Sequence, residues 1–134
     1  MNSPEDKETT GRRILVVDDN VDAATTLALL LRLMGNEVQA CFGGREALEI
    51  GRDLRPQVIV LDIAMPNLDG YETCQLIRKQ PWGADITLIA LSGYGQEEDR
   101  RHSLKAGFDG HLVKPVDLEA LQEMLEGARN KEVR

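Results

Sequence analysis

Apolar runs alternate along the chain with segments whose apolar residues recur every three or four positions. Four runs are continuously apolar, which is typical of strands covered on both faces, and a fifth alternates polar and apolar residues, as an edge strand does. Buried strands of this kind pair in parallel, and parallel pairs need helical crossovers. The continuous runs are 14–17, 58–61, 86–91 and 111–113, and the alternating run is 37–41.

The segments between these runs have helical spacing. In the first, Leu27, Leu30, Leu31 and Met34 share one face, and Gly35 is placed to end the helix in a left-handed cap. Asp69 and Asp117 suit the N-caps of two later helices. Three further predicted helices have apolar faces of the same spacing. These faces are formed by residues 47, 48, 51 and 54 in the helix before Pro56, by residues 71, 74, 77 and 78 in the next, and by residues 118, 121, 125 and 128 in the last.

One helical segment differs from the others. Residues 96–106 read QEEDRRHSLKA, with Leu104 and Ala106 as the main apolar side chains. A helix that buries so little apolar surface packs weakly. We therefore expect this helix to be a movable part of the molecule.

Five alternating strand and helix units predict an α/β fold, a single doubly wound sandwich with helices on both faces of one parallel sheet. We expect residues 1–12 to form a flexible N-terminal arm, residues 13–128 to form the domain, and residues 129–134 to form a short tail. A chain of 134 residues and 14.9 kDa fits one such domain.

Composition excludes several functions. A net charge of −7 and a pI near 4.8 oppose binding to nucleic acid or to an anionic membrane. Residues 1–10 contain no apolar stretch and the longest apolar run is short, so we expect neither a signal peptide nor a membrane span. Cys41 and Cys74 lack metal or redox spacing and are expected to be buried thiols, so we expect a cytoplasmic protein.

Polar residues follow four of the predicted strands. Asp18 and Asp19 follow the run 14–17, and Asp62 follows the run 58–61. Ser92 follows the run 86–91, and Lys114 follows the run 111–113. In an open parallel sheet, ligands bind beyond these carboxyl ends. Clustered carboxylates repel one another unless a divalent cation neutralises them, and Mg²⁺ prefers such ligands. Taken singly, each residue has a structural explanation, such as an N-cap at residues 18–20 or a turn at Ser92.

The four stretches together resemble the receiver domain of two-component response regulators, especially receivers attached to hybrid histidine kinases. They are ILVVDDN (14–20), VIVLDIAMPNLDG (58–70), IALSGYG (89–95) and FDGHLVKPV (108–116). Their joint occurrence at the strand ends overrides the single-residue explanations. The resemblance implies a flavodoxin-like sheet of strand order 2-1-3-4-5 and a role in phosphorelay signalling.

Residue roles follow from this resemblance. Asp62 resembles the phospho-acceptor of the family. The Mg²⁺ ligands implied by the resemblance are Asp18, Asp19, Asp62 and the backbone carbonyl of Ala64, and Mn²⁺ can substitute for Mg²⁺. The resemblance also implies that the Ser92 hydroxyl forms a hydrogen bond with a phosphoryl oxygen and that the Lys114 ammonium balances the developing negative charge. Pro115 resembles the cis proline of the family.

Three positions depart from common family choices. His111 stands where the family usually has Tyr or Phe as a switch partner of Ser92. We expect His111 to rotate and form hydrogen bonds, the alternative being a partly exposed histidine without a signalling role. Ala64 and Tyr94 occupy the positions that flank the path of hydrolytic water, which predicts slow self-dephosphorylation, the alternative being that Tyr94 points to solvent.

The resemblance implies a histidine kinase or a histidine phosphotransfer protein as phosphodonor, and a downstream protein partner on the 96–128 surface. It implies a phosphoryl acceptor rather than an enzyme acting on an outside substrate. Two other classes of protein fit the pattern less well. A haloacid-dehalogenase-like phosphatase needs a second acid where Ala64 stands, and a flavin- or nucleotide-binding sandwich needs a third glycine that residues 93–98 lack.

Overall fold

Five parallel strands form the centre of the molecule. The computed structural model describes residues 11–93 and 97–133, and the sheet has the order β2-β1-β3-β4-β5. The fold and strand order that the sequence predicted are therefore confirmed. The strands are β1 (Arg13–Val17), β2 (Glu37–Cys41), β3 (Val58–Asp62), β4 (Thr87–Ser92) and β5 (Gly110–Val113).

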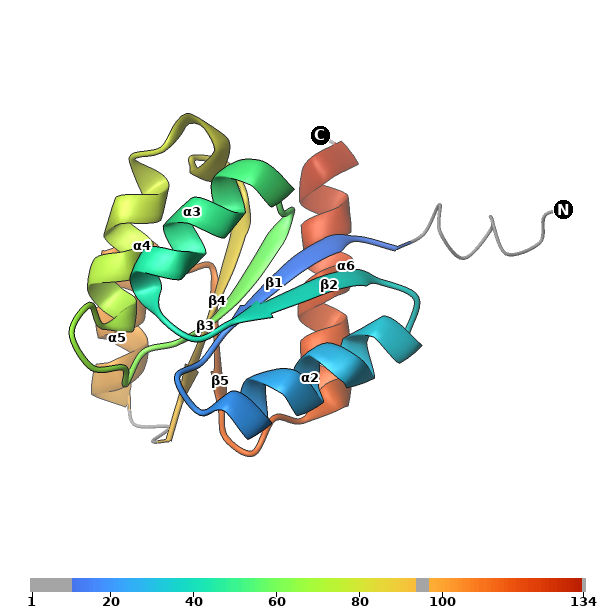
Figure 1. The fold of residues 1–134 in the computed structure, drawn as a ribbon, viewed down its shortest axis with the longest axis horizontal. Coiled ribbons are helices and arrows are strands. Elements are labelled where there is room, and N and C mark those ends of the chain that lie inside the picture. The colour runs from blue at the N-terminus through green and yellow to red at the C-terminus, as the bar shows by residue number, and fades with distance from the viewer. Residues whose placement is uncertain (1–10, 94–96, 134) are drawn as a thin grey trace, which may run out of the picture.

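Helices cover both faces of the sheet, as Figure 1 shows, with α2 and α6 on one side and α3, α4 and α5 on the other. A short 3₁₀ turn, η1, follows α4. The bounds are α2 (Val21–Leu33), α3 (Gly44–Leu54), α4 (Gly70–Arg78), η1 (Pro81–Gly83), α5 (Glu97–Ala106) and α6 (Leu118–Val133). Within the described ranges, no helix is long and apolar enough to cross a membrane.

The sheet separates two hydrophobic clusters. Every residue of β3 and β4 is buried, which explains why their sequences are continuously apolar up to the last residue. Val16 and Leu121 belong to the cluster beneath α2 and α6, and Ile59 and Ile77 belong to the cluster beneath α3 and α4. Because both faces are filled, polar side chains can approach the sheet only at its ends.

The helix ends are fixed by the residues expected there. Gly35 has a φ of 98° directly after α2, as in a left-handed cap. Asp69 and Glu72 form a reciprocal capping box at the start of α4. Ser103 and Ala106 are buried on α5 while Leu104 is 64% exposed, in keeping with the weak packing expected of this helix.

The ends of the chain differ from the expected boundaries. Residues 1–10 of the predicted arm lie outside the described residues, but Arg12 is buried, and its backbone pairs with Asn36 and Glu37. The packed part of the chain therefore includes Arg12. At the other end, α6 continues to Val133, through most of the predicted tail at 129–134.

Arg78 ties three segments together at the amino-terminal ends of β4 and β5. Its guanidinium donates to the carbonyls of Gly107 and Ile86 at 2.7 Å and to Asp109 Oδ2 at 2.8 Å. Asp109 Oδ2 also accepts the amide of Leu88. The side chain thus links the end of α4 to the loop before β4 and to the turn between α5 and β5.

Replacing Arg78 with Ala is expected to lower the free energy of unfolding by about 3 kcal/mol, because half-buried carbonyls and the Asp109 carboxylate lose a charged donor. Urea denaturation measures the loss. Arg52→Ala is the matched control, since its ion pair with Asp53 is exposed and contributes little. Equal stabilities of the two variants would show that the Arg78 network is not stabilising.

Candidate functional site

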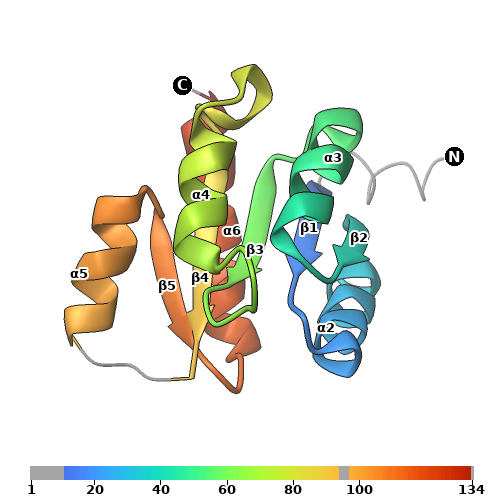
Figure 2. The same cartoon turned by 60° about the vertical axis from the view of Figure 1, so that its left-hand side comes forward.

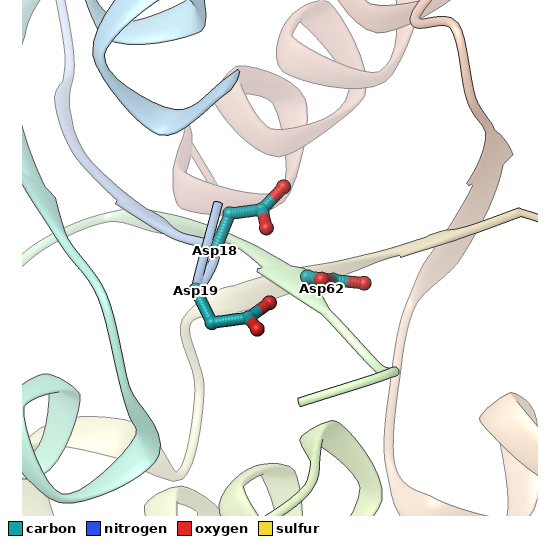
Figure 3. A group of neighbouring side chains, drawn as sticks. All are labelled: Asp18, Asp19 and Asp62. Atoms are coloured by element: carbon teal, nitrogen blue, oxygen red, sulfur yellow. The ribbon is translucent and has the colours of Figure 1, made fainter. Parts of the chain in front are cut away.

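Three carboxylates meet beyond the ends of β1 and β3. Asp18 directly follows β1, and Asp62 is the last residue of β3. Because Val17 pairs with Leu61 in the sheet, Asp18 and Asp62 lie beside each other. One oxygen from each of Asp18, Asp19 and Asp62 lies within 4.8 Å of the others, and Figure 3 shows the three side chains extending into the same space. This space is at the lower edge of the sheet in Figure 2, to which the arrowheads of β3 and β5 point.

Backbone amides orient the two buried carboxylates. Asp18 is 2% exposed and its Oδ1 accepts the amide of Asn20, whereas Asp62 is 3% exposed and its Oδ1 accepts the amide of Ala64. The N-cap of α2 is Asn20, whose side chain accepts the amide of Ala23. Capping by Asn20 therefore leaves Asp18 and Asp19 available for other contacts.

Lys114 supplies the positive charge of the site. Its Nζ lies 3.0 Å from Asp18 Oδ2 and 3.4 Å from Asp62 Oδ2. The backbone amide of Lys114 donates to the carbonyl of Ser92, which fixes the end of β5 against the end of β4. The peptide bond between Lys114 and Pro115 is cis, the isomer that the resemblance implies.

Burial and charge shift the acidity of this cluster. Burial raises the pKa of Asp62, and the neighbouring Asp18 raises it further, against the lowering effects of the Ala64 amide and of Lys114. Burial alone would lower the pKa of Lys114, but its contacts with Asp18 and Asp62 outweigh burial and raise it. The site therefore holds more carboxylate charge than Lys114 compensates.

The raised pKa of Asp62 predicts that Asp62→Asn stabilises the metal-free protein at neutral pH. Between the unfolded-state pKa near about 4 and the raised folded-state value, the folded protein binds more protons, so its unfolding free energy falls as pH rises. Asparagine removes this penalty, and each kcal/mol gained raises Tm by about 3 °C. Thermal denaturation in a chelator at several pH values should show an advantage of the variant that grows with pH. A constant or shrinking difference in Tm between the variant and the wild type as pH rises would contradict the raised pKa of Asp62.

Ser92 and His111 lie side by side at the same edge. Ser92 ends β4 and is 3% exposed, and its Oγ lies 3.0 Å from His111 Nε2. His111 is 8% exposed, so it is buried rather than partly exposed, and its role as a switch stays a prediction. On its other side, His111 Nδ1 lies 3.0 Å from the Oγ of Ser103 on α5, a contact that the sequence analysis did not anticipate.

Together these residues line an open cleft of about 520 Å³. Its described lining includes the three aspartates, Ser92, Lys114 and Ala64, so the structure brings most of the expected site residues to one place. Ala64 is exposed, and its side chain is only a methyl group. Tyr94 lies outside the described residues.

Gly70 supports the acceptor loop in a way that the sequence analysis missed. Its amide donates to the carbonyl of Ile63, and a Cβ at residue 70 would lie 2.3 Å from Ile63 Cα and 2.6 Å from the carbonyl oxygen of Asp62. Only glycine allows the start of α4 to pack this closely against the backbone of Asp62. Gly70, which follows the N-cap Asp69, therefore also shapes the site.

The donor set fits Mg²⁺. Mg²⁺ prefers oxygen ligands, retains several waters, and is commonly held by one or two carboxylates together with phosphate oxygens. The buried carboxylates of Asp18 and Asp62 and the exposed one of Asp19 supply such oxygens next to an open cleft. Burial is the main cause of the raised pKa of Asp62 and the charge of Asp18 adds to it, and a divalent cation would offset both by favouring the ionised carboxylates.

A parallel sandwich with an acidic cleft at the carboxyl edge of its sheet defines the class of this protein. The family model of the response regulator receiver domain matches residues 14–126, and the chain belongs to this family. Receiver domains of this family accept phosphoryl groups and bind Mg²⁺ at an acidic cluster, as general properties.

Two of the curated relatives that the chain matches differ from each other in length. The chain is 40% identical over 104 residues to an uncharacterized 14.6 kDa protein of Leptolyngbya boryana, covering 78% of this chain and 79% of that protein. It is 33% identical over 117 residues to the DNA-binding dual master transcriptional regulator RpaA of Synechocystis, covering 87% of this chain and 47% of that protein. The chain thus spans only about half the length of RpaA.

Solved structures show the same fold. The chemotaxis protein CheY4 of Vibrio cholerae matches with a TM-score of 0.83 and 28% identity, over 89% of this chain and 99% of that chain. The receiver domain of the sensor histidine kinase PA1611 of Pseudomonas aeruginosa matches with a TM-score of 0.79 and 33% identity, over 87% and 96%. The PA1611 structure has a magnesium ion coordinated in its active site cleft.

Proposed function

We propose that Asp62 accepts a phosphoryl group from the phosphohistidine of a histidine kinase or a histidine phosphotransfer protein. The observation that carries this proposal is the convergence of a buried strand-end carboxylate, an ammonium and two further carboxylates in one open cleft. Asp18, Asp19, Asp62 and the Ala64 carbonyl are the proposed Mg²⁺ ligands. A cation bound there would neutralise charge on the transferring phosphoryl oxygens.

The residues of the cleft divide the work of phosphoryl transfer. A carboxylate oxygen of Asp62 forms the new bond to phosphorus while the bond from phosphorus to the donor's imidazole nitrogen breaks, so the imidazole leaves with the electron pair. The Ala64 amide holds Asp62 Oδ1 in place. Lys114 stabilises the charge that spreads over the phosphoryl oxygens, and Ser92 donates its hydroxyl to one of them.

Access to the cleft suits a protein donor. The cleft adjoins a groove between α2 and the segment 114–118, and both are lined by Asp18 and Lys114. Leu27, Leu30 and Leu118 line the groove, so a donor helix could bury apolar surface there while its histidine reaches Asp62.

Ala64 and Tyr94 support the further proposal of slow self-dephosphorylation. Alanine at residue 64 lies exposed at the cleft and has no polar group to orient an attacking water. Ala64→Asn is therefore expected to shorten the phosphoryl lifetime by about 10-fold, within the range of general acid–base effects. Tyr94→Ala tests whether the ring covers the phosphoryl group. Unchanged decay of the phosphorylated protein in both variants would exclude a role for these positions.

The 96–128 surface is the proposed contact for a downstream partner. In its described part, Leu104 is 64% exposed on α5, and His102 stacks on Tyr71 of α4 with a centroid separation of 3.8 Å. Two contacts of α5 do not depend on apolar packing. His102 stacks on the ring of Tyr71, and Ser103 forms a hydrogen bond with His111. Phosphorylation at Asp62 could therefore shift α5 without disrupting a large apolar interface.

Phosphotransfer profiling tests the proposed function. The chain is incubated with Mg²⁺ and a panel of phosphorylated histidine kinases and phosphotransfer proteins, and transfer is followed by intact mass. At least one donor is expected to phosphorylate the wild type and Asp85→Asn, an exposed control at the opposite end of the sheet, but not Asp62→Asn. Equal labelling of Asp62→Asn would overturn the proposal.

A further inference from the structure

A row of three buried side chains connects the cleft to α5. Ser92 on β4, His111 on β5 and Ser103 on α5 are 3%, 8% and 1% exposed. The His111 ring lies between the two hydroxyls, with 3.0 Å from Nε2 to Ser92 Oγ and 3.0 Å from Nδ1 to Ser103 Oγ. Both ring nitrogens are therefore held in place, and the ring joins the two serines without needing to rotate.

The direction of these hydrogen bonds decides what Ser92 can do. A hydroxyl has one hydrogen to donate, and a neutral imidazole has one N–H and one acceptor nitrogen. If Ser92 donates to a phosphoryl oxygen, its Oγ must accept from His111, so Nε2 must carry a hydrogen. In the neutral ring, Nδ1 is then the acceptor and must receive its hydrogen bond from Ser103.

We propose that Ser103 is a positioning residue for phosphoryl transfer: its hydroxyl donates to Nδ1 of His111 and keeps the ring hydrogen on Nε2, so that Ser92 Oγ accepts from His111 and donates its own hydrogen to the phosphoryl group. This inference rests on the proposed phosphorylation of Asp62. Ser103 is well placed for the role, because its carbonyl accepts the amides of Gly107 and Phe108 that end α5, next to the start of β5. The hydrogen bond between Ser103 Oγ and His111 Nδ1 also makes the position of α5 depend on the state of Ser92.

The imidazole ¹⁵N resonances of His111 in the full chain test the proposal directly. Spectra are recorded at mildly alkaline pH with Mg²⁺, before and after addition of beryllium trifluoride, which mimics a phosphoryl group on a carboxylate. The expected result is a neutral ring with hydrogen on Nε2 in both states. Hydrogen on Nδ1, or on both nitrogens, would overturn the proposal, because Ser103 would then be an acceptor.

Variants separate positioning from folding. Ser103→Ala leaves Nδ1 without its donor and is expected to lower the rate of Asp62 phosphorylation by about 10-fold, with mixed tautomers of His111. Ser103→Thr, which keeps the hydroxyl, should restore both, and Glu49→Ala, an exposed side chain on α3 outside the cleft, should change neither. A wild-type rate and tautomer in Ser103→Ala would refute the inference while leaving the proposed function intact. Failure of the wild type itself to become phosphorylated would refute the proposed function instead.

Discussion

Replacing Lys114 with Ala is expected to slow phosphorylation of Asp62 by roughly 10²- to 10³-fold at saturating Mg²⁺, the loss typical of one preorganised charge-stabilising donor. Lys114 is the only basic residue among the described residues that line the cleft, and its Nζ lies 3.4 Å from Asp62 Oδ2. The phosphoryl oxygens would therefore lose their nearest ammonium. A time course with a small-molecule phosphodonor measures the rate without depending on a docking surface.

Two controls make the Lys114 result interpretable. Lys105→Ala removes the same charge from an exposed position on α5 and should phosphorylate at the wild-type rate. Circular dichroism with Mg²⁺ checks that Lys114→Ala is folded, since loss of the ammonium leaves Asp18 and Asp62 facing each other. A folded Lys114→Ala protein with a wild-type rate would remove Lys114 from the mechanism.

Replacing Asp19 with Asn is expected to weaken Mg²⁺ binding by at least about 10-fold, as measured by calorimetric titration. Asp19 is exposed, so the change should leave stability without metal nearly unaltered. Mg²⁺ should accordingly raise the Tm of the wild type more than that of the variant, because it binds the folded state preferentially.

The pH dependence of Mg²⁺ binding gives a second check on the same site. Protons compete with Mg²⁺ for Asp62, whose pKa is raised, so affinity should fall as pH is lowered towards that pKa. Asp53→Asn, an exposed acid away from the cleft, is the control and should bind Mg²⁺ like the wild type. If Asp19→Asn bound Mg²⁺ with the affinity of the wild type, the cation would have to bind at another site.

The strands could be predicted to within one residue because burial on both faces makes their sequences continuously apolar. β3 ends at Asp62 and β4 at Ser92, one residue beyond the predicted runs, because the backbone of each polar residue still pairs with the neighbouring strand. The role of Arg78 was not predictable in the same way. Its place at the end of an apolar helix face shows that its stem packs inward, but not that its guanidinium meets carbonyls from segments distant in sequence.

The acidic cluster followed from topology, since parallel strands bring Asp18, Asp19 and Asp62 to one edge. The contact of Ser103 with His111 did not, because it depends on which face of a polar helix turns inward. A signal was present: Ser103 and Ala106 are small residues one helical turn apart, and both are buried. Ser103 is polar, and Leu104, the largest apolar residue of the helix, is exposed, so a hydrophobic pattern does not reveal that face.

The central claim is that the phosphoryl group resides on Asp62. Borohydride reduction of the phosphorylated protein converts an aspartyl phosphate to homoserine, and peptide mapping then locates the modified residue. The predicted result is homoserine at residue 62 in the wild type, with Mg²⁺ required, and none in Asp62→Asn. Homoserine at another aspartate, or a phosphoryl group that resists reduction because it is on a different type of side chain, would contradict the account.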